Sequence, residues 1–506
     1  MVDWGKGYVT DTEYFELFHH PLTPQHLALT AMFNGFEPPE IDGGFTYCEL
    51  GCSRGLTSLI LAAVNPKGVF HAIDFNPASI AHAESRARAA RLSNITFHER
   101  SFETLTEPST GLPMFDMVTM HGVWSWITPE LQRAIVAFLR SHLKPGGFVY
   151  VSYNALPAWS DAIPVRRLLQ ELAATQRTRS DQAAGSAMVM MNRLAELKII
   201  PPRFQDGLKR LNDAHSHGLT YLVHEFLPAG WAPYYFADVA RALAEAKLSY
   251  VGSANLLHNF WELALNEEQR ALISEVQVPE IRETLKDFRI NNQFRLDIFV
   301  RGARPVADAR RLALLSALSL ALVAPVPDVF DIADPTGERL RPDPVVFKRI
   351  FDALQTGPRS VGELLSLAAV PMGARELVAT LLDSGLARLW RKPNSDAIDA
   401  AARFNETLRE TPFSQAATIA VPTLGLGLML SPTEFAIYTT LCRGEAPDAT
   451  AIATRILSRW RSDGIRPAVD GRPVANEEEA LDVVTRECAT KIAKNVPIWR
   501  ALGMVS

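Results

Sequence analysis

The sequence predicts an α/β fold in which a mostly parallel sheet is covered by helices on both faces. Short apolar strands alternate with helical stretches between residues 46 and 153, which is the pattern of strand–helix–strand units. A tight turn with Gly51 and Gly55 joins the first strand to the first helix, and the second strand ends in Asp74. These observations predict a Rossmann-like sheet with its ligand site at the carboxyl ends of the strands.

Composition limits the classes of function. At 506 residues the chain is too long for one core, so we expect two or three domains. A net charge of −5 argues against a surface that follows phosphate backbones, and no nucleic-acid partner is expected. The N-terminus lacks a signal-peptide pattern, and the most apolar run, residues 312–326, is too short to span a bilayer. We therefore expect a cytoplasmic protein without membrane insertion.

The cysteines do not indicate a metal site. The chain has four, too few for a disulfide framework in a chain of this length. Cys48 and Cys52 lack the second pair of ligands that a zinc site needs. We interpret them as small side chains on and just beyond a buried strand, and expect no metal.

Residues 41–159 form the predicted core domain. Strands are expected near residues 46–50, 69–74, 95–98, 115–120 and 148–153, with helices near 56–64, 77–91 and 129–142. Asn76-Pro77 and Thr128-Pro129 are typical helix starts, because Asn and Thr cap free N–H groups and Pro suits the first helical position. Lys144–Gly147 is expected to turn the chain into the fifth strand.

The remaining segments are assigned by their patterns. Residues 1–40 are too short for a core of their own, and they either dock on the next domain or form a lid over its ligand. Residues 160–230 break the alternation and are expected to be a helical insertion, with helices near 165–172 and 187–200. Alternation resumes over 231–302, where the last two strands, near 248–252 and 294–300, complete a seven-stranded sheet.

Residues 303–506 are expected to form a mostly helical C-terminal domain. Within it, three short helices and a strand over 345–392 predict a winged-helix-like module. Its third helix, 375–383, has one base against two acids, which favours a structural or protein-contacting role over DNA binding.

The turn resembles the first motif of class I S-adenosylmethionine-dependent methyltransferases, acid-x-Gly-x-Gly-x-Gly. Glu49–Gly55 follows this pattern, except that Ser53 stands where the middle glycine usually lies. Asp74 matches the acid that binds the ribose, and Lys144–Gly147 matches the turn before the fifth strand. The resemblance implies an S-adenosyl-L-methionine cofactor. It would be held by Glu49, Gly51, Cys52, Ser53, Gly55, Asp74, Phe75, Ser101, Phe102 and His121.

Longer stretches resemble bacterial methyltransferases with a methyltransferase regulatory domain. They are residues 115–127, 150–157, 224–227, 231–239 and 297–302. That group includes protein lysine methyltransferases that modify outer-membrane proteins. The resemblance therefore implies a protein substrate, such as an outer-membrane or surface protein before export. The C-terminal domain would present or select this polypeptide, or mediate a homodimer.

Methyl transfer to lysine needs no metal, because the sulfonium already activates the methyl group. An apolar, aromatic site helps by disfavouring the charged amine. No catalytic residue is assigned. The candidates for the acceptor pocket are His121, Trp124, Trp126, Tyr153 and Asn154, which follow the fourth and fifth strands. Trp126 is alternatively a cap on the next helix, and Tyr153 a core residue with a satisfied hydroxyl.

Two further questions stay open. His224-Glu225 and the aromatic residues 231–236 either cover the pocket or form an ordinary interface between insertion and core.

The leading function is N-methylation of lysine in a protein. The alternatives are a small-molecule N- or O-methyltransferase and a non-catalytic S-adenosylmethionine-binding scaffold, to which only Ser53 points. The fourth strand lacks the acid or Asn followed by Pro-Pro that is usual in methyltransferases acting on DNA bases.

Overall fold

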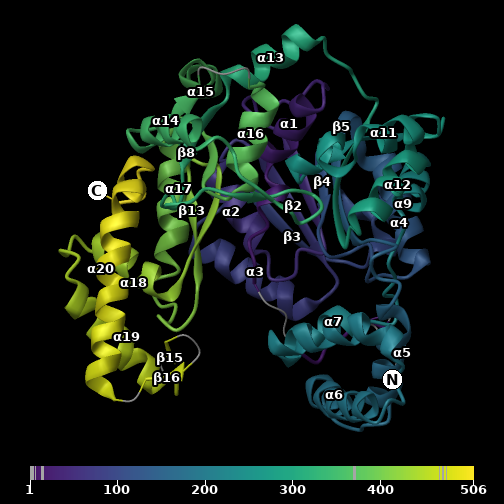
Figure 1. Ribbon diagram of the computed structural model, residues 1–506, viewed down its shortest axis with the longest axis horizontal. Coiled ribbons are helices and arrows are strands. Elements are labelled where there is room, and N and C mark those ends of the chain that lie inside the picture. The colour runs from purple at the N-terminus through teal and green to yellow at the C-terminus, as the bar shows by residue number, and fades with distance from the viewer. Residues whose placement is uncertain are drawn as a thin grey trace.

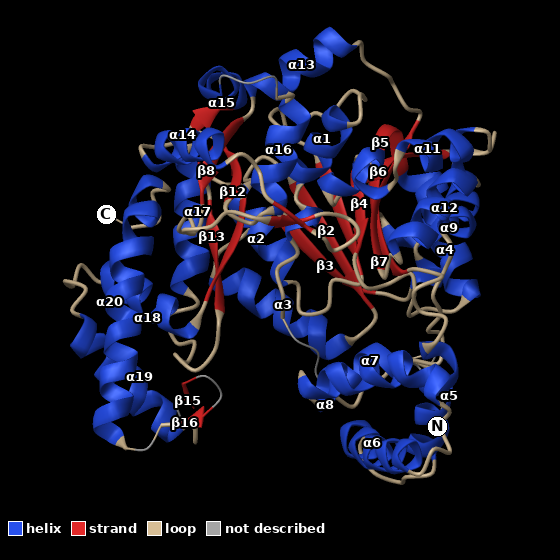
Figure 2. Cartoon of the chain, in the orientation of Figure 1, coloured by secondary structure: helices blue, strands red, loops and turns tan. Residues whose placement is uncertain are grey.

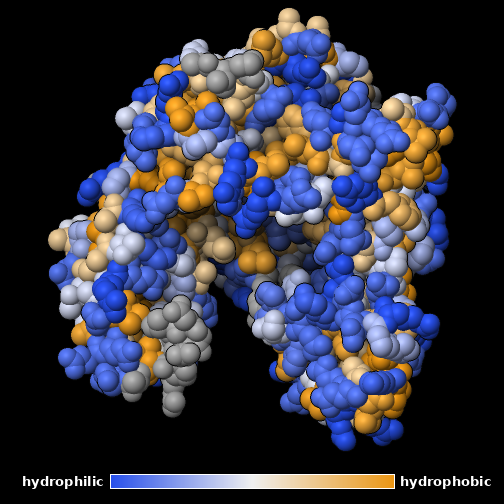
Figure 3. Space-filling model, viewed as in Figure 1, coloured by the Kyte–Doolittle hydropathy of each residue, from blue (hydrophilic) through white to orange (hydrophobic). Residues whose placement is uncertain are grey.

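The computed structural model describes residues 5, 7–12, 16–368, 372–465, 468–469, 472–474 and 476–505. A central sheet is flanked by helices, and the C-terminal elements form a separate lobe beside it (Figures 1 and 2). The helices of residues 162–226 lie together below the sheet in the same view. Figure 3 shows this face of the molecule hollowed between that helical group and the C-terminal lobe, with apolar residues deep in the hollow.

The central sheet has seven strands, as the sequence predicts. Their order is β3-β2-β1-β4-β5-β7-β6, and β7 runs antiparallel to both of its neighbours. The strands are β1 (Thr46–Leu50), β2 (Val69–Asp74), β3 (Ile95–Glu99), β4 (Phe115–Met120), β5 (Leu143–Asn154), β6 (Leu248–Ser253) and β7 (Phe294–Arg301). The carboxyl ends of β1 to β5 therefore meet at one edge of the sheet.

Helices cover both faces of this sheet. They are α1 (Pro24–Phe33), α2 (Leu56–Val64), α3 (Pro77–Ala89), α4 (Pro129–His142), α9 (Phe236–Ala244) and α12 (Pro279–Ile290). Two short helices, α10 (Trp261–Ala264) and α11 (Glu267–Ser274), lie between β6 and α12 in the chain. Asn76 Oδ1 caps α3 by accepting from the backbone N–H groups of Ala78 and Ser79. The turn expected at Lys144–Gly147 is instead an irregularity inside β5, where Gly146 takes a φ of +80° and the register with β4 shifts.

Four helices form the group below the sheet. They are α5 (Ala162–Ala174), α6 (Ser180–Glu196), α7 (Gln205–Ser216) and α8 (Leu219–Phe226). Helix α6 begins earlier than the sequence suggests. It also ends earlier, because Lys198 adopts a left-handed φ of +58° that an α-helix cannot continue through. These helices share a buried apolar cluster of their own, which includes Trp159, Leu169 and Phe226.

The C-terminal region is mostly helical. Its elements are α13 (Asp308–Ala317), β8 (Ser319–Leu322), β9 (Ile332–Ala333), β10 (Arg339–Leu340), α14 (Pro344–Gln355), β11 (Arg359–Ser360), α15 (Val361–Ala368), α16 (Ala374–Asp383), β12 (Ala387–Trp390), α17 (Ser395–Glu406), β13 (Ala417–Val421), β14 (Leu426–Leu430), α18 (Pro432–Cys442), α19 (Ala449–Ser462), β15 (Ala468–Val469), β16 (Arg472–Pro473) and α20 (Glu477–Ala501). Strands β11, β8 and β12 form a small sheet beside α14 to α16. The winged-helix interpretation of 345–392 stays a prediction.

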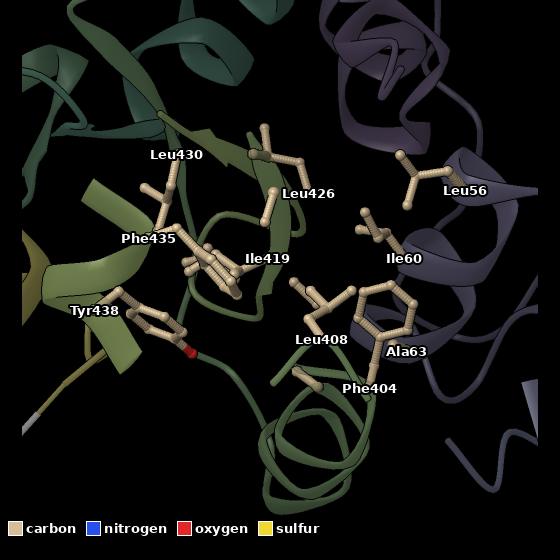
Figure 4. Close-up of a cluster of buried hydrophobic side chains, with 14 of the residues drawn as sticks. Leu56, Ile60, Ala63, Phe404, Leu408, Ile419, Leu426, Leu430, Phe435 and Tyr438 are labelled. Carbon is tan, nitrogen blue, oxygen red and sulfur yellow. The ribbon is translucent and has the colours of Figure 1, made fainter. Parts of the chain in front are cut away.

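Helix α2 lies between the central sheet and the C-terminal lobe. All nine of its residues are buried. Its outer face packs on α17, β13 and β14, where Ile60 meets side chains such as Phe404 and Leu426 (Figure 4). Arg391, just after β12, donates to the carbonyl oxygen of Val64 at 2.7 Å. A guanidinium at this position satisfies a free carbonyl and suits the negative end of the helix dipole.

A buried charge cluster joins α12 to β7. The guanidinium of Arg295 contacts Asp287 at 2.8 Å, Asp297 at 2.7 Å and Glu283 at 3.2 Å. Lys286 adds a second cation, 2.8 Å from Glu283. All five side chains are nearly inaccessible to water, so each charge depends on its partners.

Among the described residues, no helix combines the length and the apolar character that crossing a bilayer requires.

Candidate active site

A cavity of about 1050 Å³ lies at the edge of the sheet where β1, β2, β4 and β5 end. Three parts of the chain form its wall: the loops after these strands, the N-terminal residues before α1, and the insertion helices α7 and α8. Every residue that the sequence assigns to the cofactor borders this cavity. They are Glu49, Gly51, Cys52, Ser53, Gly55, Asp74, Phe75, Ser101, Phe102 and His121.

The turn after β1 is held close to the neighbouring strands. Gly51 and Cys52 donate their backbone N–H groups to the carbonyl oxygen of Ile73, at 2.8 and 3.1 Å. Gly51 has a φ of +74°, and a Cβ there would come within 2.5 Å of Val123 Cγ2. Only glycine meets both conditions, so the backbone comes close to β4 and to the cavity. The turn ends at Gly55, which precedes the first residue of α2.

Asp74 closes the other side of the turn. Its Oδ2 accepts from the backbone N–H of Ser53 at 2.8 Å, and its Oδ1 accepts from that of Asn76 at 2.9 Å. Burial raises the pKa of the Asp74 carboxyl, while these backbone donors lower it. The carboxylate borders the cavity, and it has more lone-pair positions than backbone donors, so it can still accept from a hydroxyl.

Ser53 adopts a left-handed backbone with a φ of +48°. Such a conformation strains any residue with a Cβ, and it explains why the motif usually has glycine there. A Ser53→Gly variant is expected to raise the free energy of unfolding by about 0.5–1 kcal/mol. Glycine relieves the backbone strain, and this gain is partly offset because glycine has more conformational entropy in the unfolded chain. Thermal denaturation without cofactor measures this. Ser53→Ala keeps the strain and should show no gain; an equal gain there would contradict the explanation.

Glu49 is buried at the end of β1 and borders the cavity. Its Oε2 accepts from the hydroxyl of Ser58 on α2. Burial raises the pKa of Glu49 to about 7, although the hydrogen bond from Ser58 opposes this shift. The side chain thus ties the strand to the helix at the base of the loop.

The acceptor side of the cavity contains three of the five candidates. His121, Trp126 and Asn154 line it. Trp124 and Tyr153 do not, and this corrects the expectation for both. The hydroxyl of Tyr153 donates to Asp297 at 2.6 Å inside the core, because side chains alternate along β5 and Tyr153 faces away from Asn154. Trp124 packs among the same core side chains and is 1% exposed.

His121 is paired with a residue that the sequence does not single out. Its ring stacks on that of His19, with 3.8 Å between the ring centroids. Burial lowers the pKa of His19 to about 4 and that of His121 well below its usual value. Both rings are therefore neutral at pH 7, which permits the stack. No local pattern identifies His19, since it lies some 100 residues from His121 in the chain.

The N-terminal residues dock on the core and also border the cavity. Helix α1 packs into the core, where His26 Nε2 contacts the carbonyl oxygen of Ala254 at 2.7 Å. The preceding residues border the cavity and bridge its two sides. Thr12 contacts the ring of His224 on α8, and Glu16 forms ion pairs with Arg54 at 3.0 Å and Arg86 at 2.7 Å. Residues 1–4, 6 and 13–15 lie outside the described part.

The insertion contributes His224, Glu225 and Phe226 to the cavity wall, but the aromatic residues 231–236 do not border the cavity. Trp231 packs within the insertion, where the guanidinium of Arg166 lies 4.5 Å from its ring. Tyr234 accepts from Gln132 on α4, so these aromatics form an interface between insertion and core. Within the described ranges, no group of three or more His, Cys, Asp or Glu is arranged to hold a metal ion.

Comparison with known proteins identifies the family. The family described as "Methyltransferase domain" matches residues 41–207, and that described as "Predicted methyltransferase regulatory domain" matches residues 219–301. The uncharacterized protein sll1526 of Synechocystis sp. is 30% identical over 519 residues, covering 99% of each chain. The chain belongs to the S-adenosylmethionine-dependent methyltransferases with a methyltransferase regulatory domain.

Solved structures show the same fold for this methyltransferase. PKMT2 from Rickettsia typhi in complex with AdoHcy matches with a TM-score of 0.70 at 18% identity, over 97% of this chain and 99% of that one. A second structure of PKMT2 matches with a TM-score of 0.68 at 17% identity. Because the match runs over both chains almost completely, the methyltransferase shares the C-terminal lobe as well as the sheet.

Proposed function

We propose that the methyltransferase modifies lysine side chains of a protein. The observation that carries the proposal is that one cavity joins the cofactor turn and Asp74 to an aromatic wall, made of Trp126, Trp159, Phe226 and Phe294. Such a wall accepts the alkyl stem of a lysine and disfavours its charged form, which helps the amine to lose its proton. The resemblance of residues 115–127 and 224–227 to lysine-modifying relatives supports the same substrate.

The residues around the turn fit the cofactor. Asp74 borders the cavity with a carboxylate that can accept from ribose hydroxyls, and the glycine backbone at 51 and 55 leaves room beside the strands. We assign Glu49, Gly51, Cys52, Ser53 and Gly55 to the cofactor loop. Phe75, Ser101 and Phe102 would flank the adenine, with His121 near the methionine end. When bound, S-adenosylmethionine supplies the methyl group: a nitrogen–carbon bond forms from the acceptor lone pair while the carbon–sulfur bond breaks, its electron pair staying on sulfur.

The surroundings of the cavity are consistent with a polypeptide substrate. The C-terminal lobe and the insertion flank a broad hollow in the surface (Figure 3). We assign residues 303–506 the role of presenting or selecting the polypeptide, which would be an outer-membrane or surface protein before export. Residues 41–159 then bind the cofactor, and residues 160–230 form the insertion over the acceptor.

Incubation with isotope-labelled S-adenosylmethionine and a cell-envelope extract tests this function. Label is expected in one or a few proteins, and in N-methyllysine after their hydrolysis. An Asp74→Ala preparation serves as the control and should transfer far less. Label in a small soluble product would instead indicate a small-molecule methyltransferase, and tight cofactor binding without any transfer would indicate a scaffold.

A further inference from the structure

An unsatisfied amide lies on the acceptor side of the cavity. Asn154 ends β5 and borders the cavity, and its side chain is 2% exposed. Its backbone is fixed, because its N–H donates to Ser125 Oγ and its carbonyl oxygen accepts from the N–H of Tyr234, both at 2.9 Å. Yet its Nδ2 has no hydrogen-bond partner among the described residues. A buried N–H₂ group without a partner costs stability, so we expect this amide to donate to an acceptor when the site is occupied.

Glu225 on α8 is the acid next to this amide. It is half-buried and borders the same cavity, and Arg166 is the cation whose charge acts on its carboxyl. Burial raises the pKa of Glu225 to about 7, whereas the nearby Asn154 amide and the charge of Arg166 favour the ionised form. Arg166 does not pair with it, since this guanidinium donates to the carbonyl oxygen of Pro228 and lies over Trp231.

The two groups complement one class of ligand. A half-buried carboxyl that Arg166 does not contact directly attracts a further cation, and the aromatic wall around it accepts an alkyl chain. An ammonium group on a flexible alkyl stem combines both features. A neutral or anionic ligand would leave Glu225 without a counter-ion and would gain nothing from its charge.

We propose that Glu225 and Asn154 form the subsite that holds the acceptor amine, and that Glu225 takes its proton. This inference rests on the proposed function, because it requires an amine as acceptor. The proton moves from the ammonium nitrogen to a carboxylate oxygen of Glu225, which leaves the amine neutral with a free lone pair. Asn154 Nδ2 donates to the carboxylate while the amine is bound. The proton then leaves Glu225 for water at the mouth of the cavity.

Other charged groups surround this subsite. Arg166 lies on α5, and Tyr221 and His224 lie on α8 itself. Burial raises the pKa of Tyr221 and lowers that of His224, so both are neutral at pH 7. Asp11, Arg210, Asp213 and His217 also border the cavity. Of these, Asp213 is paired with Lys209 at 3.5 Å and is well exposed. It therefore provides a control for Glu225, as an acid that borders the cavity but lies outside the subsite.

Calorimetry with two cofactor analogues tests the subsite without a known substrate. Sinefungin carries an amine-bearing carbon where AdoHcy has sulfur, so it places an ammonium beside the acceptor position. The wild-type protein is expected to prefer sinefungin over AdoHcy by about tenfold, as for a hydrogen bond to a charged group. The preference should rise as pH increases through about 7, where Glu225 ionises. Glu225→Gln should bind AdoHcy normally and lose both the preference and its pH dependence.

The controls keep the inference falsifiable. Asp213→Asn removes a cavity acid outside the subsite and should keep the preference; a loss there would overturn the inference in favour of general electrostatics. A wild-type preference that is absent or independent of pH would overturn it even if Glu225→Gln does not fold. The labelling experiment tests the protein substrate independently. If the wild-type protein prefers sinefungin but labels no protein, the amine subsite stands and the protein substrate is rejected.

Discussion

Replacing Arg295 by methionine is expected to lower the free energy of unfolding by about 3–5 kcal/mol. The substitution keeps much of the volume but removes the cation that Asp287, Asp297 and Glu283 share in a nearly dry environment. Lys286 remains to balance Glu283 alone, so the carboxylates of Asp287 and Asp297 would be buried without a counter-ion. Urea denaturation followed by circular dichroism measures the change.

A surface arginine provides the control for this loss. Arg88 on α3 is 71% exposed and pairs loosely with Glu84 at 3.5 Å. Arg88→Met is therefore expected to change stability by less than about 0.5 kcal/mol. Equal losses in the two variants would show that the buried cluster contributes no more than an exposed pair.

Replacing Asp74 by alanine is expected to weaken S-adenosylmethionine binding by about a hundredfold. The variant loses the acceptor assigned to two ribose hydroxyls, each worth about 1.5 kcal/mol or more when the acceptor is charged. It also frees the backbone N–H of Ser53, which now donates to Asp74 at 2.8 Å, so the loop becomes less ordered. Isothermal calorimetry with S-adenosylmethionine measures the loss.

Glu99→Ala serves as the matched control for Asp74. Glu99 ends the neighbouring strand β3, is exposed and does not border the cavity. Its removal should leave the affinity within about twofold of wild type, because a screened surface charge contributes little. Unchanged binding by Asp74→Ala would reject the assignment of the ribose site to this carboxylate.

The sequence predicts those parts of the site that depend on local patterns. Gly51 and Gly55 lie in a strand-to-helix turn, and Asp74 ends the next strand, so the parallel sheet alone brings them together. The positions of the seven strands are predicted in the same way, whereas their order in the sheet is a finding of the structure. The departure at Ser53 is visible in the sequence, but its strained backbone is not.

What the sequence misses depends on contacts between distant segments. His19 meets His121, and Glu225 approaches Asn154, only because the N-terminal residues and the insertion fold back over the sheet edge. Tyr153 and Trp124 are placed wrongly for a related reason. Position after a strand fixes which edge a residue lies near, but not whether its side chain faces the ligand or the core.

The mostly apolar stretch 56–64 predicts one further feature of the fold. A helix that is apolar on all sides must be covered on all sides, and the sheet covers only one face of α2. The pattern therefore predicts a second layer over this helix, but it does not identify the segment that forms that layer. The structure gives that role to residues from 404 onward (Figure 4).

This double coverage bears on how the protein can be divided. Helix α2 starts at the cofactor turn. At its other end Arg391 donates to the carbonyl oxygen of Val64, and Phe404 and Leu426 pack against its outer face. A fragment ending near Gly302 would present Leu56, Ile60 and their neighbours to water, next to the place where the nucleoside must sit. Such a fragment is therefore expected to be less stable than the full chain and to hold the cofactor turn less firmly.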